Sequence, residues 1–358
     1  MGRTPAGFAA ASPRVGRSRA LGRAMTMALM ACAVSVSACG GGAGGGEGVG
    51  PGGASADAPA PAGPLATVQE RQCQDAGWHR AVVTAAGLER LVLWKAPPDG
   101  RWRQGALIVM HGGGGSHTNF CVANVPLIEP QVRFTAQALA AGFAVFLLDS
   151  SDRTSDQAGR LCGKVWDDEV HPRASLDLPF IDQVLGTLIP AKRPPDGRPE
   201  IFATGLSSGG YMTVRAASRF GDRLRAIAPV SSGDPYGWAR DCTPQVSDRS
   251  NVFGVARDVE TGRTISEPGA CRGADTSRER PWDTSPGGAR PAFRQFHHEG
   301  DAIHDVSCVE KVAAQLVAHG FGQTPALRLT GPPRDAAWHY WLDEYNAPML
   351  AFFSSFIR

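Results

Sequence analysis

Three residues that could act together in nucleophilic catalysis are Ser207, Asp301 and His339, and each lies in the loop or turn that follows a predicted strand. A serine hydroxyl is a weak nucleophile at neutral pH, so a histidine must accept its proton during attack. A carboxylate must hold the imidazole in the correct tautomer and stabilise the imidazolium that forms. The residue types therefore predict acyl transfer, with Ser207 as nucleophile, Asp301 as acid and His339 as base.

The sequence around Ser207 is the central motif. It reads Gly-Leu-Ser-Ser-Gly, between an apolar run at 201–204 and a helix-like run at 211–220. A serine on so sharp a strand-to-helix turn forms a nucleophile elbow, with its hydroxyl lifted clear of the sheet. Side chains at the flanking positions would collide there, which explains Gly205 and Gly209. A third glycine, Gly210, would let the helix that follows pack closely.

A glycine-rich loop, His111 followed by four glycines, comes directly after the apolar run 106–110. Glycines let backbone N–H groups approach a developing negative charge without side chains in the way. We expect the amides of Gly113 and Ser208 to form an oxyanion hole. The rival interpretation, a phosphate-binding loop, is disfavoured because the Gly-Lys-Ser/Thr ending is missing.

Other residues compete for the acid and the base. The alternatives are Asp305, Glu299 and Asp283 for the acid, and His297, His298 and His304 for the base. We favour Asp301 because it ends a predicted strand and follows Gly300. We favour His339 because the other histidines adjoin the acid instead of occupying a later loop. Asp149 also ends a strand, but it precedes the serine, so we expect a structural role for it.

Strands and helices alternate along the chain, which predicts an α/β domain whose largely parallel central sheet is flanked by helices. The predicted strands are 78–84, 88–95, 106–110, 143–148, 201–204, 224–230, 291–298 and 326–330. The predicted helices are 131–141, 171–189, 211–220, 306–319 and a closing helix capped by Asn346. The chain order serine, acid, histidine is that of the α/β-hydrolase fold, and we expect a single catalytic domain over 71–358.

The stretch 233–291 shows no sustained periodicity and predicts an insertion before the acid-bearing strand. Its aromatic residues and its cysteines, Cys242 and Cys271, favour an ordered insertion beside the site, stapled by a disulfide. The alternative is a peripheral excursion packed by its own side chains. As candidates for substrate binding we name Trp238, Trp282 and Trp338, the last with a purely packing role as its alternative.

The first 39 residues are typical of an export signal. Arginines precede an apolar stretch, 24–38, that is too short to span a bilayer. The stretch ends in Val-Ser-Ala before Cys39, in a pattern similar to the lipobox of bacterial lipoproteins. We therefore expect a lipid anchor at Cys39, a flexible linker over 40–70, and an outer-membrane or cell-surface location. Ordinary signal cleavage, giving a secreted or periplasmic enzyme, is the alternative.

Composition limits the partners. A net charge of +2 in 358 residues argues against nucleic acid as a partner. Six of the eight cysteines lie outside the export signal, and an even number in an exported chain favours disulfides, with the pairing left open. No close C-x-x-C pair occurs, so we expect neither a metal site nor a cofactor. The oligomeric state stays open.

Together these motifs resemble the extracellular polyhydroxyalkanoate depolymerase and feruloyl-esterase-like group of α/β-hydrolases. The resemblance covers roughly 91–358 and rests on four short stretches. They are His111-Gly112, Gly205 to Gly210, His297 to Asp301, and Trp338-His339. It implies hydrolysis of carboxylesters, with polyhydroxybutyrate-type polyesters, their oligomers or feruloyl and acetyl esters of plant cell walls as substrates.

Two further function classes compete with an ester hydrolase. A serine peptidase of the dipeptidyl-peptidase type shares the fold, but such enzymes usually carry a large extra domain that this sequence lacks. The second is a non-catalytic, surface-anchored binding protein that kept the scaffold. We disfavour it because the sequence retains the serine, the acid, the histidine and the glycine loop that catalysis needs.

Overall fold

The computed structural model describes residues 66–151, 154–155, 161–168, 170, 174–236, 281–301, 303–331 and 335–357. The predicted export signal with Cys39, nearly all of the linker, and Trp238, Cys242 and Cys271 lie outside these residues. The side chains of Cys162 and Cys308 lie outside them too.

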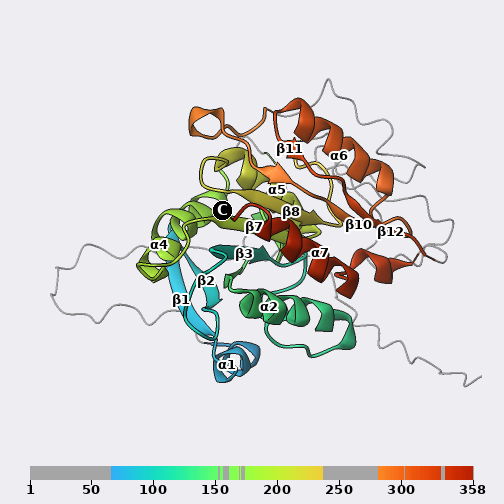
Figure 1. Ribbon diagram of the computed structural model, residues 1–358. Coiled ribbons are helices and arrows are strands. Elements are labelled where there is room, and N and C mark those ends of the chain that lie inside the picture. Colours follow the sequence, from blue (N-terminus) through green and yellow to red (C-terminus); the bar gives the residue numbers. More distant parts are fainter. Residues whose placement is uncertain are drawn as a thin grey trace, which may run out of the picture. The chain divides into compact units, whose positions relative to one another are not determined.

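One mixed sheet of ten strands organises the described residues (Figure 1). Its strands are β1 (His79–Ala85), β2 (Leu88–Lys95), β3 (Ala106–Met110), β4 (Ala144–Leu148), β7 (Ile201–Leu206), β8 (Ala226–Val230), β9 (Ala292–Phe293), β10 (Phe296–His298), β11 (Gly322–Gln323) and β12 (Leu327–Leu329). A separate pair is formed by β5 (Thr154–Ser155) and β6 (Leu161–Gly163).

The order of the strands identifies the fold. The main path runs β1-β2-β4-β3-β7-β8-β10-β12, with β9 and β11 paired beside it. Strand β2 is antiparallel to both β1 and β4, and every pairing from β4 to β12 is parallel. This order, with an antiparallel second strand, is that of the α/β-hydrolase fold. The predicted fold class is confirmed.

Helices cover both faces of the sheet (Figure 1). They are α1 (Val68–Asp75), α2 (Glu129–Ala141), α3 (Leu178–Gln183), α4 (Ile189–Lys192), α5 (Ser208–Arg219), α6 (Val306–Ala318) and α7 (Asp343–Ser354). Short helical turns are η1 (His117–Phe120), η2 (Pro126–Ile128), the π-helical η3 (Val184–Leu188), η6 (Pro286–Gly288) and η7 (Ala336–His339). None of these helices is both long and apolar enough to cross a membrane.

The core is divided by the sheet because successive side chains of a strand point to opposite faces. In β3, Leu107 and Val109 join the cluster that includes α2 and α7. Ile108 and Met110 join the cluster that includes α3, α5 and α6. Since β3 is buried on both faces, its continuous apolar run replaces the alternating pattern of a half-exposed strand.

The start of α7 corrects one expectation. Asn346 does not cap the closing helix, which begins at Asp343. The Asn346 carboxamide instead accepts from Trp341 Nε1 at 2.7 Å and donates to the Pro130 carbonyl at 3.2 Å. The residue therefore joins α7 to the first turn of α2, a contact across more than 200 residues that local capping patterns do not contain.

The predicted helix 171–189 is also corrected. Among the described residues, α3 begins only at Leu178, where Pro179 occupies the first turn. The Ser175 hydroxyl accepts from the N–H groups of Asp177 and Leu178, which ends the preceding loop. The predicted strand 291–298 divides into β9 and β10, since β9 pairs with β11 and β10 pairs with β12.

Candidate active site

Ser207 lies on the turn between β7 and α5 with backbone angles φ 52° and ψ −120°. A residue other than glycine at positive φ is strained, and such strain persists where the surrounding structure enforces it. Here the Ser207 N–H donates to the Val230 carbonyl of β8 at 2.9 Å, and the Ser207 carbonyl accepts from Tyr211 at 2.9 Å. The turn has the geometry of a nucleophile elbow.

The glycines around Ser207 are required by space. A Cβ atom on Gly205 would lie 2.3 Å from the Gly209 carbonyl oxygen, and one on Gly209 would lie 2.4 Å from the Met110 carbonyl oxygen of β3. A Cβ on Gly210 would lie 2.6 Å from Ser232 Cβ. The predicted need for small residues is confirmed, and the structure shows that two of the three glycines meet neighbouring strands or loops.

Asp301 and His339 are in direct contact, as the predicted acid and base must be. The distance from His339 Nδ1 to Asp301 Oδ2 is 2.8 Å, and both residues are buried. The other oxygen, Oδ1, accepts from the N–H groups of Ile303 and His304 at 2.8 and 2.9 Å. A carboxylate held in this way can only accept, so His339 Nδ1 carries the hydrogen and Nε2 is the nitrogen that can take up a proton.

The charge state of Asp301 agrees with this arrangement. Burial by itself would raise its pKa, but the charge and hydrogen bond of His339, followed by His297 and His304, outweigh burial and lower the pKa below its ordinary value. The acid is therefore ionised near neutral pH, as a residue that orients an imidazole must be.

The turns that carry Ser207 and Asp301 are joined through α5. Tyr211, one helical turn after Ser207, places its hydroxyl 3.4 Å from His304 Nδ1. The His304 N–H is one of the donors to Asp301. Strands β7, β8, β10 and β12 are adjacent and parallel, so the residues at their carboxyl ends share one edge of the sheet.

The predicted oxyanion-hole residues lie side by side. A Cβ atom on Gly113 would be 3.8 Å from Ser208 Cβ. His111 Nε2 accepts from the Ser150 N–H at 3.0 Å, so its Nδ1 carries the hydrogen and donates to the Gly112 carbonyl at 2.7 Å. Because a trans peptide is planar, fixing the Gly112 carbonyl also sets the direction of the Gly113 N–H. The sequence did not reveal this role of His111.

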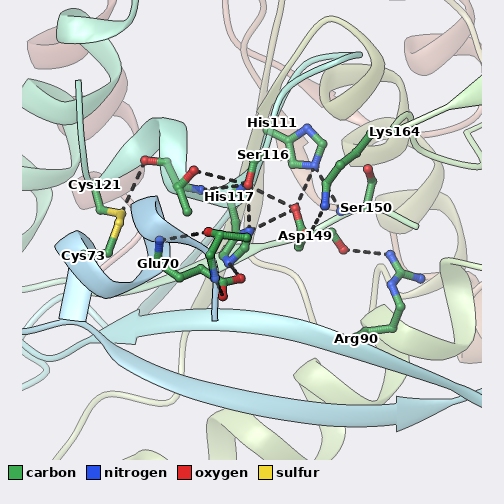
Figure 2. Close-up of polar contacts among 12 residues, drawn as sticks. Glu70, Cys73, Arg90, His111, Ser116, His117, Cys121, Asp149, Ser150 and Lys164 are labelled. Carbon is green, nitrogen blue, oxygen red and sulfur yellow. Dashed lines mark hydrogen bonds and ion pairs between the residues drawn. A yellow bond between two sulfur atoms is a disulfide. The ribbon is translucent and has the colours of Figure 1, made fainter. Parts of the chain in front are cut away.

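Next to the glycine loop lies a polar cluster, which we call the backing cluster, formed by the buried residues Glu70, His117 and Asp149 and the partly exposed Lys164 (Figure 2). His117 lies between two carboxylates, 3.0 Å from Asp149 Oδ1 and 3.2 Å from Glu70 Oε1. Burial alone would lower the pKa of His117, but the two carboxylates raise it above its ordinary value. The Asp149 pKa lies well below its ordinary range, because its histidine partners outweigh burial. The backing cluster supports the structural role expected for Asp149.

A disulfide joins Cys73 of α1 to Cys121 at the end of η1, and so fastens the N-terminal helix beside this cluster. Helix α1 itself begins at Val68, two residues before the predicted end of the linker at residue 70. Thr67 caps it in a reciprocal pair with Glu70.

The competing histidines surround the acid. His297 is fully buried with Nδ1 3.8 Å from Asp301 Oδ2, and neither ring nitrogen has a hydrogen-bond partner among the described residues. Burial lowers the pKa of His297 to about 4 and that of His304 to about 3. His298 Nδ1 accepts from the Gly300 N–H.

Of the competing acids, Asp283 accepts from Arg215 and Tyr236 instead of a histidine.

The two described candidate tryptophans have different surroundings. Trp338 is half-buried and stacks on His298, with ring centroids 4.3 Å apart and an interplanar angle of 7°. Trp282 stacks on both Tyr236 and His319, with centroid distances of 4.2 and 3.8 Å, and packs against the core. These contacts pack Trp282 against the core near the end of the predicted insertion, and its role in substrate binding stays a prediction. Among the residues described, no group of side chains has the composition and spacing of a metal site.

No protein-family model and no curated protein matches this chain. Among solved structures it resembles esterase PE8, at 12% identity over 74% of this chain and 97% of that chain, with a TM-score of 0.45. It also resembles Est1E from Butyrivibrio proteoclasticus, at 13% identity over 77% of this chain and 96% of that chain, with a TM-score of 0.41. An S-formylglutathione hydrolase from Agrobacterium tumefaciens has 13% identity over 78% of this chain and 95% of its own, with a TM-score of 0.47. Because these sequence identities and TM-scores are low, the fold assignment rests on the strand order of the sheet.

Proposed function

We propose that this protein is a serine carboxylester hydrolase with Ser207 as nucleophile, His339 as general base and Asp301 as the acid that orients it. The observation that carries the proposal is the buried 2.8 Å contact between His339 Nδ1 and Asp301 Oδ2. It lies at the sheet edge where the strained elbow presents Ser207. A paired imidazole and carboxylate at the same sheet edge as a serine on an elbow turn support acyl transfer.

In the acylation step, Ser207 Oγ attacks the ester carbonyl carbon while His339 Nε2 takes the hydroxyl proton. The carbonyl oxygen becomes an oxyanion, and the N–H groups of Gly113 and Ser208 donate to it. Collapse of the tetrahedral intermediate breaks the bond to the alcohol oxygen. His339 returns the proton to that oxygen, so the alcohol leaves and an acyl-enzyme remains.

In the deacylation step, water takes the place of the alcohol. His339 Nε2 accepts a proton from the water as its oxygen attacks the acyl carbon, and the same oxyanion hole receives the charge. Collapse then breaks the bond to Ser207 Oγ and returns the proton to it. The products are a carboxylic acid and the free enzyme.

As substrates we infer polyhydroxyalkanoate-type polyesters or their oligomers. The support is the match of the motifs around His111, Ser207, Asp301 and His339 to the depolymerase-like group. Feruloyl or acetyl esters of plant cell walls are the competing class. Hydrolysis of a polyhydroxybutyrate film, hydroxybutyrate oligomers and methyl ferulate by the same preparation distinguishes the two, since a cell-wall esterase would release ferulate and leave the film and the oligomers intact.

We further propose that the chain is exported and anchored through a lipid on Cys39. The basic segment, the short apolar stretch and Val-Ser-Ala before the cysteine support this. Cells fed radiolabelled palmitate should label the wild-type chain and leave Cys39→Ser unlabelled. Equal labelling of both would show that another residue carries the lipid, and an unlabelled wild-type chain would show that it carries none.

Labelling by a fluorophosphonate tests the enzymatic proposal directly. The wild-type chain should be labelled once and should hydrolyse short p-nitrophenyl esters, whereas Ser207→Ala should do neither. Ser218→Ala is the matched control, because Ser218 is a buried serine of α5, the helix that follows Ser207, and its hydroxyl donates to the Val214 carbonyl. A wild-type chain that binds esters without labelling or turnover would favour the non-catalytic binding protein.

A further inference from the structure

The side chain of Ser208 has two hydrogen bonds that its proposed role does not require. An oxyanion hole uses only the backbone N–H of this residue, which nearly any residue could supply. Yet the Ser208 hydroxyl donates to Asp168 Oδ2 at 2.7 Å and accepts from the Trp166 N–H at 3.1 Å. Asp168 is 1% exposed and Ser208 is 7% exposed, so both bonds are shielded from water. A bond between a hydroxyl and a carboxylate is among the stronger hydrogen bonds in proteins.

The segment that supplies Asp168, residues 164–168, also contacts the glycine loop. The Lys164 carbonyl accepts from the Gly114 N–H at 2.8 Å, and Trp166 Nε1 donates to the His111 carbonyl at 2.8 Å. A Cβ atom on Gly113 would meet Val165 at 3.2 Å. One segment of five residues therefore touches both halves of the proposed oxyanion hole.

This segment is fixed to the core independently of Ser208. The Asp167 N–H donates to the buried carboxylate of Asp177, whose other oxygen pairs with Arg90. The Asp167 carbonyl accepts from Arg215 Nη1 at 2.8 Å, and Arg215 lies on α5. Since the main chain on both sides of Asp167 is held, the neighbouring Asp168 carboxylate is a stable point of attachment.

We propose that Asp168 is a positioning residue for the oxyanion hole, acting through the hydroxyl of Ser208. The proposal rests on the function proposed above. By holding the Ser208 side chain, Asp168 and the Trp166 N–H set the place of the Ser208 backbone N–H relative to that of Gly113. Donors must lie within about 2.7–3.1 Å of the oxyanion, so a small displacement lowers transition-state stabilisation more than substrate binding.

The test compares Ser208→Ala, Asp168→Ala and Asp168→Asn with the control Ser218→Ala in the full-length protein. Activity on a short p-nitrophenyl ester is counted per active site titrated with a fluorophosphonate, so that loss of folded protein does not enter kcat. Ser208→Ala and Asp168→Ala should each lower kcat about tenfold with KM within about twofold. The inhibition constant of a trifluoromethyl ketone, which forms a tetrahedral oxyanion on the serine, should rise by the same factor.

Two further comparisons separate positioning from simple structural support. Asp168→Asn should retain most of kcat, because the carboxamide oxygen still accepts from the Ser208 hydroxyl. The double variant Ser208→Ala/Asp168→Ala should be no slower than either single variant, because both changes remove the same bond. Ser218→Ala should match the wild type.

The outcomes have distinct meanings. Wild-type kcat in Ser208→Ala, or effects of the two alanine variants that add in the double variant, would overturn the positioning role and leave the esterase proposal intact. An inactive wild-type protein, or an active Ser207→Ala variant, would overturn the proposed function and the positioning role with it.

Discussion

Asp301 and Asp335 are paired by a parallel β-bridge, in which the Asp335 N–H donates to the Gly300 carbonyl at 3.0 Å. The Asp335 carboxylate then accepts from the Ala337 N–H at 2.7 Å and caps η7, whose last residue is His339. The main chain thus connects the turn of the acid to the turn of the base. The relative position of Asp301 and His339 is therefore held by the main chain as well as by the hydrogen bond between their side chains.

Replacement of each of two buried aspartates by asparagine should affect different properties, kcat for one and stability for the other. Asp301→Asn should lower kcat by roughly 10⁴-fold, because an amide cannot hold His339 in the required tautomer. Asp149→Asn should instead lower the free energy of unfolding by about 3 kcal/mol, because it removes the buried counter-ion of Lys164 and one of the two carboxylates beside His117. Its kcat per titrated site should stay within about fivefold of the wild type.

Steady-state kinetics and urea unfolding on the same preparations measure both effects. If Asp149→Asn loses activity as deeply as Asp301→Asn while remaining stable, the acid has been assigned to the wrong residue.

Acid should destabilise the protein through the buried His297. The pKa of His297 is about 4 in the folded state and about 6.5 in an unfolded chain. Between these values the unfolded state binds protons that the folded state does not, so stability falls as the pH falls from about 6.5 toward 4. His117, whose pKa is raised, acts oppositely: its contribution is full below about 6.5 and is lost as the pH rises through its folded pKa.

The variant His297→Phe keeps a ring of similar shape and removes the titration. Between pH 7 and pH 5 it should lose about 2 kcal/mol less stability than the wild type, by urea unfolding. The control is His79→Phe, at an exposed position, which should follow the wild type. Parallel pH profiles for wild type and His297→Phe would contradict the depressed pKa.

The disulfide between Cys73 and Cys121 should contribute to stability. It closes a loop with a sequence separation of 48, for which the loss of unfolded-state entropy corresponds to about 4 kcal/mol. The double variant Cys73→Ser/Cys121→Ser should therefore melt roughly 10 °C lower than the oxidised wild type. Its kcat at 25 °C should change little, because neither cysteine belongs to the proposed catalytic residues. Peptide mapping that finds both thiols free in exported protein would remove the basis of this expectation.

A pair of glycine-to-alanine variants tests the packing of α5, the helix that follows Ser207. Gly210→Ala would place its Cβ 2.6 Å from Ser232 Cβ and 2.9 Å from the Val230 carbonyl oxygen, so α5 must shift. We expect the free energy of unfolding to fall by about 2–3 kcal/mol. We also expect kcat to fall, because the shift of α5 moves Ser207 and Ser208. Gly186→Ala meets only the flexible end of Arg223, at 3.2 Å, and should be neutral or stabilising by up to about 1 kcal/mol. Equal unfolding free energies for the two variants would show that α5 tolerates the added methyl group.

Local sequence determined the elements and the elbow. The apolar run 106–110 matches β3 in full, and 201–204 lies within β7. Gly142 ends α2 with φ 103°, a conformation that glycine adopts without the steric cost of a Cβ atom. The turn at Ser207 could be predicted from its flanking glycines, because the clash that Gly205 avoids is with Gly209 on the same turn. These features depend on neighbours in sequence, so a single sequence contains them.

Tertiary structure decided which polar groups meet. Asp301 contacts His339 across 38 residues, and Asp168 contacts Ser208 across 40. The partners of Asn346 and the backing cluster around Asp149 likewise come from separate elements. Such pairs depend on the order in which strands join the sheet, and neither hydrophobic periodicity nor capping motifs specify that order. Only the folded chain brings the 164–168 segment against both the glycine loop and the elbow, because the hydrogen bonds that hold it extend from several elements of the domain at once.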